Sequence, residues 1–89
     1  EAYDMGLVHG VAAEGGLDAM VDEITGAISQ NAPLTIALAK AAAREIAKPE
    51  SKQDHRKLEK MAEACFDSDD FKEGRRAFME KRKPAFKGK

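Results

Sequence analysis

The basic tail is the part of this sequence with the clearest potential for ligand chemistry. Residues 81–89 contain five basic side chains and no acidic one: Lys81, Arg82, Lys83, Lys87 and Lys89. Two aromatic residues, Phe78 and Phe86, alternate with these cations. Cations bind phosphate groups and aromatic rings stack on flat ring systems, but a solvated helix end with a frayed tail has the same pattern. Both interpretations are open on the pattern alone.

The other reactive residue types are isolated from one another. His9 and His55 have no neighbours at the spacings of a zinc site, so we expect a strand or loop histidine and a solvated helix histidine. Cys65 is in phase with Leu58 and Met61, which favours a buried, inert thiol over a nucleophile. No nucleophile is paired with a base at a recognisable spacing. We therefore expect no catalytic residue and no metal site.

Three aspartates, Asp67, Asp69 and Asp70, lie just before the last helical pattern. The glycine and terminal glutamate of an EF-hand loop do not follow them, so a cation site is not indicated. We interpret them as the acidic N-terminal end of a helix whose other end carries the cations of residues 81–83, because these charges match the helix dipole. Pro84 is expected to terminate that helix. The glycine at position 74 costs about 1 kcal/mol within it unless another group packs closely.

Composition limits the possible partners and locations. The 89 residues include fifteen basic and sixteen acidic ones, with a formal net charge of −1, so no global field attracts nucleic acid or an anionic membrane. The single cysteine cannot form an intramolecular disulfide, and no apolar run is long enough to cross a bilayer. We expect a cytoplasmic location, or the mitochondrial matrix in a eukaryote.

Apolar residues recur at spacings of three and four along four stretches, as on one face of an amphipathic helix. Helices are expected over residues 17–31 and 33–47, the second with Pro33 in its first turn. A third, reaching residue 66, would begin at a capping box formed by Ser51 and Asp54, and a fourth covers 67–83. The sequence predicts an all-α fold: a small bundle of about four helices behind a short extended N-terminal segment.

The first residues resemble the end of a helix already under way. Gly6 occupies the position of a left-handed residue that closes a helix, and residues 7–11 are β-prone without a second strand to pair with. Their backbone groups would need partners outside this chain. We expect residues 1–15 to be the end of a core helix and a short strand or loop of a larger body, and residues 16–89 to be a C-terminal helical subdomain.

Three motifs in this order resemble one known family. Residues 1–8 contain Glu-Ala followed by Gly-Leu-Val, similar to an "EA…GLV" strand start, and residues 31–40 are similar to a "NAPLA…AK" helix junction. Residues 69–86 are similar, with few departures, to the ending "(S)(E/D)D..EG..AF.EKRKP.F". Together the motifs span almost the whole chain. The chain resembles the C-terminal third of the enoyl-CoA hydratase/isomerase (crotonase) family.

The resemblance implies a parent enzyme of which this chain carries no catalytic part. In the family, two backbone N–H groups polarise the thioester carbonyl and acidic side chains transfer protons, and all of these lie upstream of the matched segment. The implied parent is a lyase that hydrates a 2-enoyl-CoA and needs no cofactor beyond the CoA carried by its substrate. Arg75 and Arg76 add charge where the family often has less, which leaves the acyl substrate open.

The resemblance also implies ligand and partner contacts for this segment. Phe78 and Lys81 match positions that contact the CoA nucleotide, where a ring lies against adenine and an ammonium meets phosphate. The C-terminal helices of the family cover the active site and pack against other subunits, so a homo-oligomer, a trimer or hexamer, is expected. One alternative is a freestanding helical module that binds a protein partner. A nucleic-acid binder is disfavoured by the balanced charge.

Overall fold

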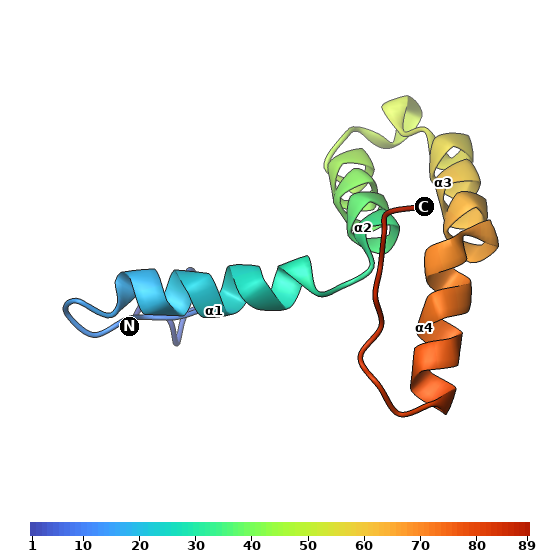
Figure 1. Ribbon diagram of the computed structural model, residues 1–89. Helices are drawn as coiled ribbons and strands as arrows, with labels where there is room; N and C mark the ends of the chain where they lie inside the picture. The colour runs from blue at the N-terminus through green and yellow to red at the C-terminus, as the bar shows by residue number, and fades with distance from the viewer.

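The computed structural model describes residues 1–89, which form helices joined by turns and loops without any strand (Figure 1). The helices, in chain order, are α1 (Leu17–Ser29), α2 (Pro33–Ile46), the short 3-10 turn η1 (Glu50–Lys52), α3 (His55–Asp67) and α4 (Asp69–Met79). The predicted all-α class with four helices is therefore confirmed. None of the helices combines the length and the apolar character that a membrane crossing requires.

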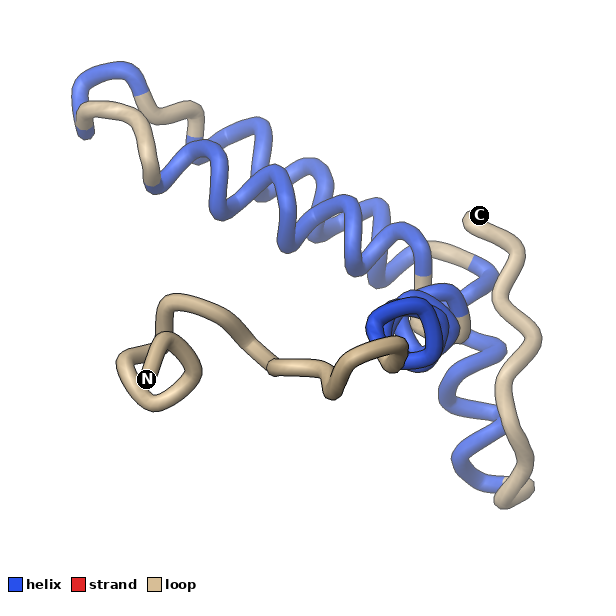
Figure 2. Tube along the Cα trace, turned by 90° about the vertical axis from the view of Figure 1, so that its left-hand side faces the viewer, coloured by secondary structure: helices blue, strands red, loops and turns tan.

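The helices form two separate parts of an open molecule. α2 and α3 run antiparallel, α4 continues from the end of α3, and α1 projects away from all three (Figures 1 and 2). The radius of gyration is 17.0 Å, whereas a compact chain of this length has about 12 Å. Ala77 is the only fully buried apolar residue. The chain thus leaves most of its apolar helix faces uncovered.

The first turns of the helices follow sequence signals, with one exception. Pro33 occupies the first helical position of α2, as predicted. The predicted capping box at the third helix is wrong, because Ser51 lies in η1 and Asp54 is itself the N-cap. The Asp54 carboxylate accepts a hydrogen bond of 2.9 Å from the Lys57 amide. An aspartate oxygen satisfies a free amide of the first turn as well as a hydroxyl does.

The corner at the N-terminal end of α3 is held by Glu45, a nearly buried residue at the end of α2. Its carboxylate accepts hydrogen bonds from the Lys48 ammonium at 2.6 Å and from the Asp54 amide at 2.9 Å. The hydrogen bond from Lys48, followed by that from the Asp54 amide, lowers the pKa of Glu45 below its ordinary value. One carboxylate thereby links the end of α2 to the start of α3.

A serine holds the opposite corner, where α3 meets α4. The Ser68 hydroxyl donates to the Cys65 carbonyl at 2.6 Å and accepts from the Phe71 amide at 3.0 Å. It therefore closes one helix and caps the next, so that the two helices follow one another without a loop.

The N-terminal segment forms hydrogen-bonded turns where the sequence predicts a helix end, and it contains neither a helix nor a strand. Amides of residues 5–7 donate to the carbonyls of Glu1, Tyr3 and Ala2 at 2.9–3.0 Å, and Gly6 has a φ of 76°. This is the hydrogen-bond pattern of a Schellman helix end. Residues 7–11 form no strand because no other strand in the chain can pair with them.

Candidate functional site

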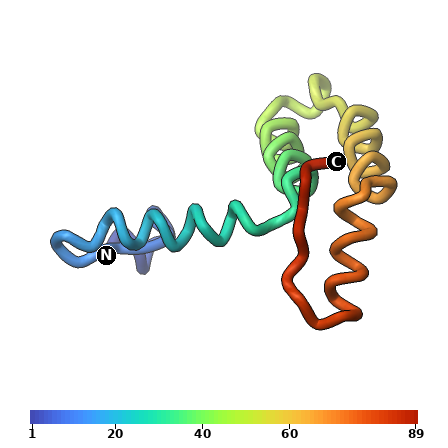
Figure 3. The backbone as a smooth tube through the Cα atoms, in the orientation of Figure 1, coloured from blue at the N-terminus to red at the C-terminus, as the bar shows by residue number.

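The basic tail folds back along α4 and forms a helix–tail hairpin, defined here as residues 69–89. Figure 3 shows the tail leaving the end of α4, reversing direction and running beside the helix toward α2. Asp70, Glu73 and Ala77 are spaced so that they lie on one face of α4. Ala77 is 1% exposed and Asp70 is 3% exposed, so this face is covered.

Asp70 holds the far end of the tail. Its Oδ1 atom accepts a hydrogen bond from the Lys87 amide and its Oδ2 atom accepts one from the Gly88 amide, both at 2.7 Å. The Asp70 amide in turn donates to the Lys89 carbonyl at 2.9 Å. A Cβ added at Gly88 would stand 3.9 Å from the side chain of Pro33, at the start of α2. The frayed tail left open by the sequence is therefore not what the structure contains.

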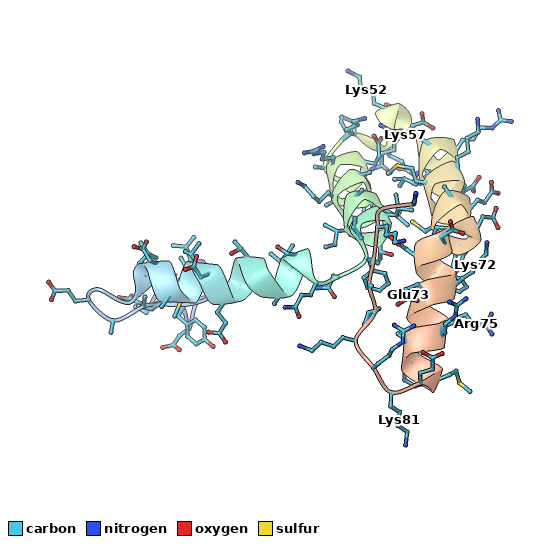
Figure 4. The ribbon with its side chains drawn as sticks, viewed as in Figure 1. Lys52, Lys57, Lys72, Glu73, Arg75 and Lys81 are labelled. Atoms are coloured by element: carbon cyan, nitrogen blue, oxygen red, sulfur yellow. The ribbon has the colours of Figure 1, made fainter.

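Glu73 holds the near end of the tail. Its carboxylate accepts two hydrogen bonds from the Arg82 guanidinium, at 2.6 and 3.1 Å, and a third from the Ala85 amide at 2.9 Å. Figure 4 shows the Glu73 side chain directed from α4 toward the tail. The hydrogen bonds from Arg82, and then that from Ala85, lower the pKa of Glu73 to about 2.

Arg82 is shared between two carboxylates. Besides the fork to Glu73, its Nε atom donates to Glu80 at 2.6 Å. The hydrogen bonds with Glu73 and then with Glu80 raise the pKa of Arg82 above its ordinary value. Its charge is consequently compensated within the chain and is poorly available to an external anion.

The two predicted ligand-contact residues lie where α4 meets the tail, with Phe78 in the last turn of the helix and Lys81 in the turn that follows it. The helix ends at Met79, so the prediction that residues 80–83 continue it and that Pro84 terminates it is wrong. Instead, the Lys81 amide donates to the Phe78 carbonyl at 3.3 Å and the Arg82 amide donates to the Ala77 carbonyl at 3.0 Å. These two bonds form a second Schellman end, with Lys81 as its left-handed residue.

Lys81 is the only residue other than glycine with a positive φ, at 52°. That conformation costs a residue with a Cβ roughly 1 kcal/mol. Figure 4 shows the Lys81 side chain pointing away from the hairpin at the outer end of the turn. Lys81 and Lys83 make no ion pair within the chain. Lys81 therefore presents an uncompensated cation from a strained backbone position.

Phe78 lies at an apolar pocket formed by α2, α3, α4 and the tail. The pocket encloses about 480 Å³, and nine of its fourteen lining residues are hydrophobic, among them Leu38, Phe71 and Phe86. The Phe78 side chain is nevertheless 82% exposed. Lys81 does not line this pocket. The structure joins the two predicted residues through one backbone hydrogen bond but places only the ring against the apolar wall.

Phe86 closes the tail side of the pocket by lying over Gly74. A Cβ added at Gly74 would stand 3.5 Å from the Phe86 ring, an ordinary van der Waals contact. The sequence left open whether a group packs closely against this helical glycine, and in the structure the Phe86 ring lies there. Its distance shows that an alanine would also fit.

The remaining candidates from the sequence are far from one another. His9 is exposed in the N-terminal segment and His55 is exposed at the first position of α3. Cys65 is half-buried in the wall of the apolar pocket. No three His, Cys, Asp or Glu side chains are grouped so that they could hold a metal ion. Asp69 and Asp70 lie in the first turn of α4, as expected, whereas Asp67 ends α3.

The roles of Asp70 and Glu73 were not found from the sequence, which assigned the aspartate to the helix dipole and gave the glutamate no role. Their partners lie 9 to 18 residues away, outside any helical repeat. A usable signal was present, however. Two acids on one helix face, followed after a turn by a basic segment, indicate that the segment returns along that face.

Comparisons with known proteins agree on one family. The family model described as enoyl-CoA hydratase/isomerase matches residues 1–89. The chain is 33% identical to a methylmalonyl-CoA decarboxylase of Escherichia coli K12, over 98% of this chain and 34% of that protein. It is 36% identical to an enoyl-CoA hydratase of Mycobacterium tuberculosis, over 100% of this chain and 34% of that protein.

A solved structure agrees with the sequence relatives. The chain superimposes on an enoyl-CoA hydratase/isomerase from Mycobacterium paratuberculosis with a TM-score of 0.80 and 28% identity, covering 99% of this chain and 35% of that one. The chain thus spans about a third of the length of each relative.

Proposed function

Because this chain belongs to the enoyl-CoA hydratase/isomerase family, we propose that it is the C-terminal helical segment of an enzyme acting on acyl-CoA thioesters. In this proposal the helix–tail hairpin contacts the CoA nucleotide of the substrate, and the uncovered helix faces contact the body of the enzyme and a neighbouring subunit. The catalytic acids and the carbonyl-polarising amides belong to that body. The segment alone performs no reaction.

The names of the two relatives support contact with CoA and not with the acyl group. One is a methylmalonyl-CoA decarboxylase and the other an enoyl-CoA hydratase, so the reactions and acyl groups differ and the CoA carrier is common. Both match this chain over nearly its full length. A segment retained beside two different chemistries fits a role in binding what the two substrates share. For the parent reaction we propose hydration of a 2-enoyl-CoA.

The single observation that carries the proposal is the exposure of Phe78 next to an uncompensated lysine. An 82% exposed phenylalanine ring at the end of a helix is unfavourable in water, and Lys81 adds backbone strain. An adenine lying on the ring would cover apolar surface, and a CoA phosphate would satisfy the ammonium. Both unfavourable features would then be explained by one ligand.

Subunit contact is proposed for the uncovered apolar faces. α1 leaves Leu17, Val21, Ile24 and Ile28 between 46% and 64% exposed on one face. A face of this kind marks an interaction surface. We propose that it lies against the body of the parent enzyme and its neighbours in a trimer or hexamer.

Titration with CoA tests the nucleotide contact. We expect the 89-residue chain to bind CoA in isothermal titration calorimetry and to bind pantetheine, which lacks the nucleotide, at least about tenfold more weakly. Phe78→Ala and Lys81→Ala should each weaken CoA binding by about fivefold to tenfold. Lys72→Ala is the matched control, because Lys72 is an exposed cation on the same helix that points elsewhere (Figure 4). Equal effects of all three substitutions, or no CoA binding, would refute the proposal.

The exposed faces also support a second candidate, a freestanding helical module that binds a protein partner. The two functions predict different ligands for the same chain. A module of that kind would not bind CoA, so neither Phe78→Ala nor Lys81→Ala would change the CoA titration. The titration above therefore distinguishes them.

A further inference from the structure

The strained conformation of Lys81 requires a cause within the chain. Glycine or asparagine usually occupies the left-handed residue of a Schellman end, because a Cβ is disfavoured there. The two Schellman hydrogen bonds of this turn form equally well around glycine, so they do not explain a lysine. The residue that follows Lys81 is held much more firmly than a helix end requires.

Arg82 is fixed to α4 by both its backbone and its side chain. Its amide donates to the Ala77 carbonyl at 3.0 Å. Its guanidinium reaches back to Glu73 with two hydrogen bonds and to Glu80 with one. Glu80 is the C-cap of the helix, so Lys81 is the single residue between two fixed positions. The chain must therefore reverse its direction at Lys81 alone, and the left-handed conformation of Lys81 produces this reversal.

We propose that Glu73 and Arg82 are positioning residues that hold Lys81 in its left-handed conformation and so direct its ammonium outward to the phosphate of a CoA-bearing ligand. This rests on the proposed function for the identity of the ligand, whereas the positioning itself rests on the contacts of the hairpin. The two neighbouring cations then have different roles. Arg82, neutralised by two carboxylates, fixes the turn, and Lys81, without an ion pair, is free to bind.

The ion pair between Glu73 and Arg82 is consistent with these different roles of Arg82 and Lys81. The hydrogen bonds from Arg82 and then from Ala85 lower the pKa of Glu73 to about 2, so its ion pair with Arg82 persists in mildly acidic solution as well as at neutral pH. Glu73 is 19% exposed at its side chain and Arg82 is 38% exposed, so the fork is partly shielded from water. The third hydrogen bond of Glu73, from the Ala85 amide, fixes the tail beyond the turn as well. One carboxylate on α4 therefore holds two successive points of the tail, Arg82 directly after Lys81 and Ala85 farther along.

A double-mutant cycle separates positioning from general loss of structure. Glu73→Ala should weaken CoA binding by about fivefold, close to the effect of removing the ammonium itself. Lys81→Gly removes the ammonium but keeps a residue that adopts positive φ freely. In the Lys81→Gly background, Glu73→Ala should then change CoA affinity by less than about twofold, because no ammonium is left to position. Glu73→Gln, which keeps an acceptor for the Ala85 amide, gives a second variant if Glu73→Ala disturbs folding.

A second readout needs no ligand. The Cα and Cβ chemical shifts and the amide-to-Hα coupling of Lys81 report a left-handed residue in the unsubstituted chain. They should move toward averaged values in Glu73→Ala and in Arg82→Gln, while the shifts of α2 remain unchanged. Asp69→Ala, an exposed acid on the same helix, is the control and should leave Lys81 unchanged.

The outcomes separate the two proposals. If Lys81 keeps its left-handed shifts in Glu73→Ala, or if Glu73→Ala weakens CoA binding equally in the Lys81→Gly background, the positioning role is overturned. If the shifts respond as expected but Lys81→Ala does not alter CoA binding, positioning stands and the CoA contact fails. If neither the chemical shifts of Lys81 nor the CoA affinity responds to these substitutions, both the positioning role and the CoA contact are overturned.

Discussion

The helix–tail hairpin and the N-terminal region, residues 1–32, differ in their side-chain hydrogen bonds and in the exposure of their apolar side chains. In the hairpin, two carboxylates on α4 bind three tail amides and one guanidinium, so the geometry is determined inside the chain. In the N-terminal region the only side-chain hydrogen bonds are local ones within α1 and its end, and the apolar face stays exposed. One region fixes its own shape, and the other leaves its apolar face uncovered.

Charge separates the two regions as well. Every lysine and arginine of the chain lies at or after Lys40, whereas residues 1–32 contain only acids among their charged groups: Glu1, Asp4, Glu14, Asp18, Asp22 and Glu23. Within the hairpin, Lys72 and Arg82 pair with carboxylates, whereas the acids of α1 form no ion pair. A ligand-contact surface needs a fixed geometry before the ligand arrives. The hairpin has that geometry, and α1 does not.

The largest expected effect in the hairpin comes from Asp70. Asp70→Ala leaves two part-buried tail amides without an acceptor and should lower the free energy of unfolding by about 3 kcal/mol. Asp70→Asn keeps one acceptor oxygen and should cost about half as much. The neighbouring Asp69→Ala, which loses an exposed ion pair and one first-turn acid, should cost less than about 1 kcal/mol. Urea titrations followed by circular dichroism measure all three, and equal costs for positions 69 and 70 would contradict the role of Asp70.

Acid should act next most strongly on the same region. The folded-state pKa of Glu73 is about 2 and its ordinary value is 4.5, so its stabilising contribution is complete above about pH 4.5. That contribution is lost as pH falls from 4.5 toward 2, since the unfolded chain binds the proton first. Glu45, whose pKa is also lowered, adds a loss of the same sign at the start of α3.

Glu73→Gln is the control for the acid effect. It should flatten the decline in stability between pH 4.5 and 2, because the substituted side chain does not titrate, and Glu45→Gln should flatten the rest. Unfolding curves at half-unit pH intervals measure this. An unchanged acid limb in Glu73→Gln would show that other carboxylates dominate it.

These differences also show what the sequence could predict. The helical stretches at 17–31 and 33–47 agree with α1 and α2, and Gly6 is the left-handed residue that the sequence predicted, because each depends on residues within a few positions of one another. The family followed from motif order. Phe78 and Lys81 as CoA contacts came only from the resemblance, and they stay predictions.

The hairpin could not be predicted in the same way. The bonds from Asp70 to residues 87 and 88 depend on where a flexible segment settles, which periodicity does not encode. The end of α4 was misplaced because the left-handed residue is a lysine and not the glycine that signals such an end. The cap of α3 was misplaced because Ser51 and Asp54 both suit an N-cap. Contacts distant in sequence thus placed the tail, whereas ambiguous local signals misplaced the two helix boundaries.

A smaller effect of opposite sign is expected at the turn. Lys81→Gly should raise the free energy of unfolding by about 1 kcal/mol, because glycine adopts the φ of 52° without a Cβ penalty. Lys81→Ala keeps the Cβ and should leave stability unchanged within about 0.3 kcal/mol. Thermal and urea unfolding of the two variants measure the difference. A stabilising alanine and a neutral glycine would contradict the strain assigned to Lys81.

The smallest effect is expected in the N-terminal region. Ile24→Gln replaces a half-exposed side chain on α1 by a polar one of similar helix propensity, so the unfolding of α2, α3 and α4 should change by less than about 0.5 kcal/mol. Leu38→Gln in α2, where the residue lines the apolar pocket, should cost about 1–2 kcal/mol. Equal costs would mean that α1 packs on the rest of the chain.

Amide hydrogen exchange of the dilute, monomeric chain tests most directly whether the hairpin is self-determined and α1 is not. The amides of Ala85, Lys87 and Gly88 lie in irregular backbone but donate to carboxylates, so they should exchange at least about tenfold more slowly than unprotected amides. The amides in the middle of α1 should exchange faster than these, because an isolated helix of 13 residues is marginal in water. Slow exchange in α1 together with unprotected tail amides would contradict the account.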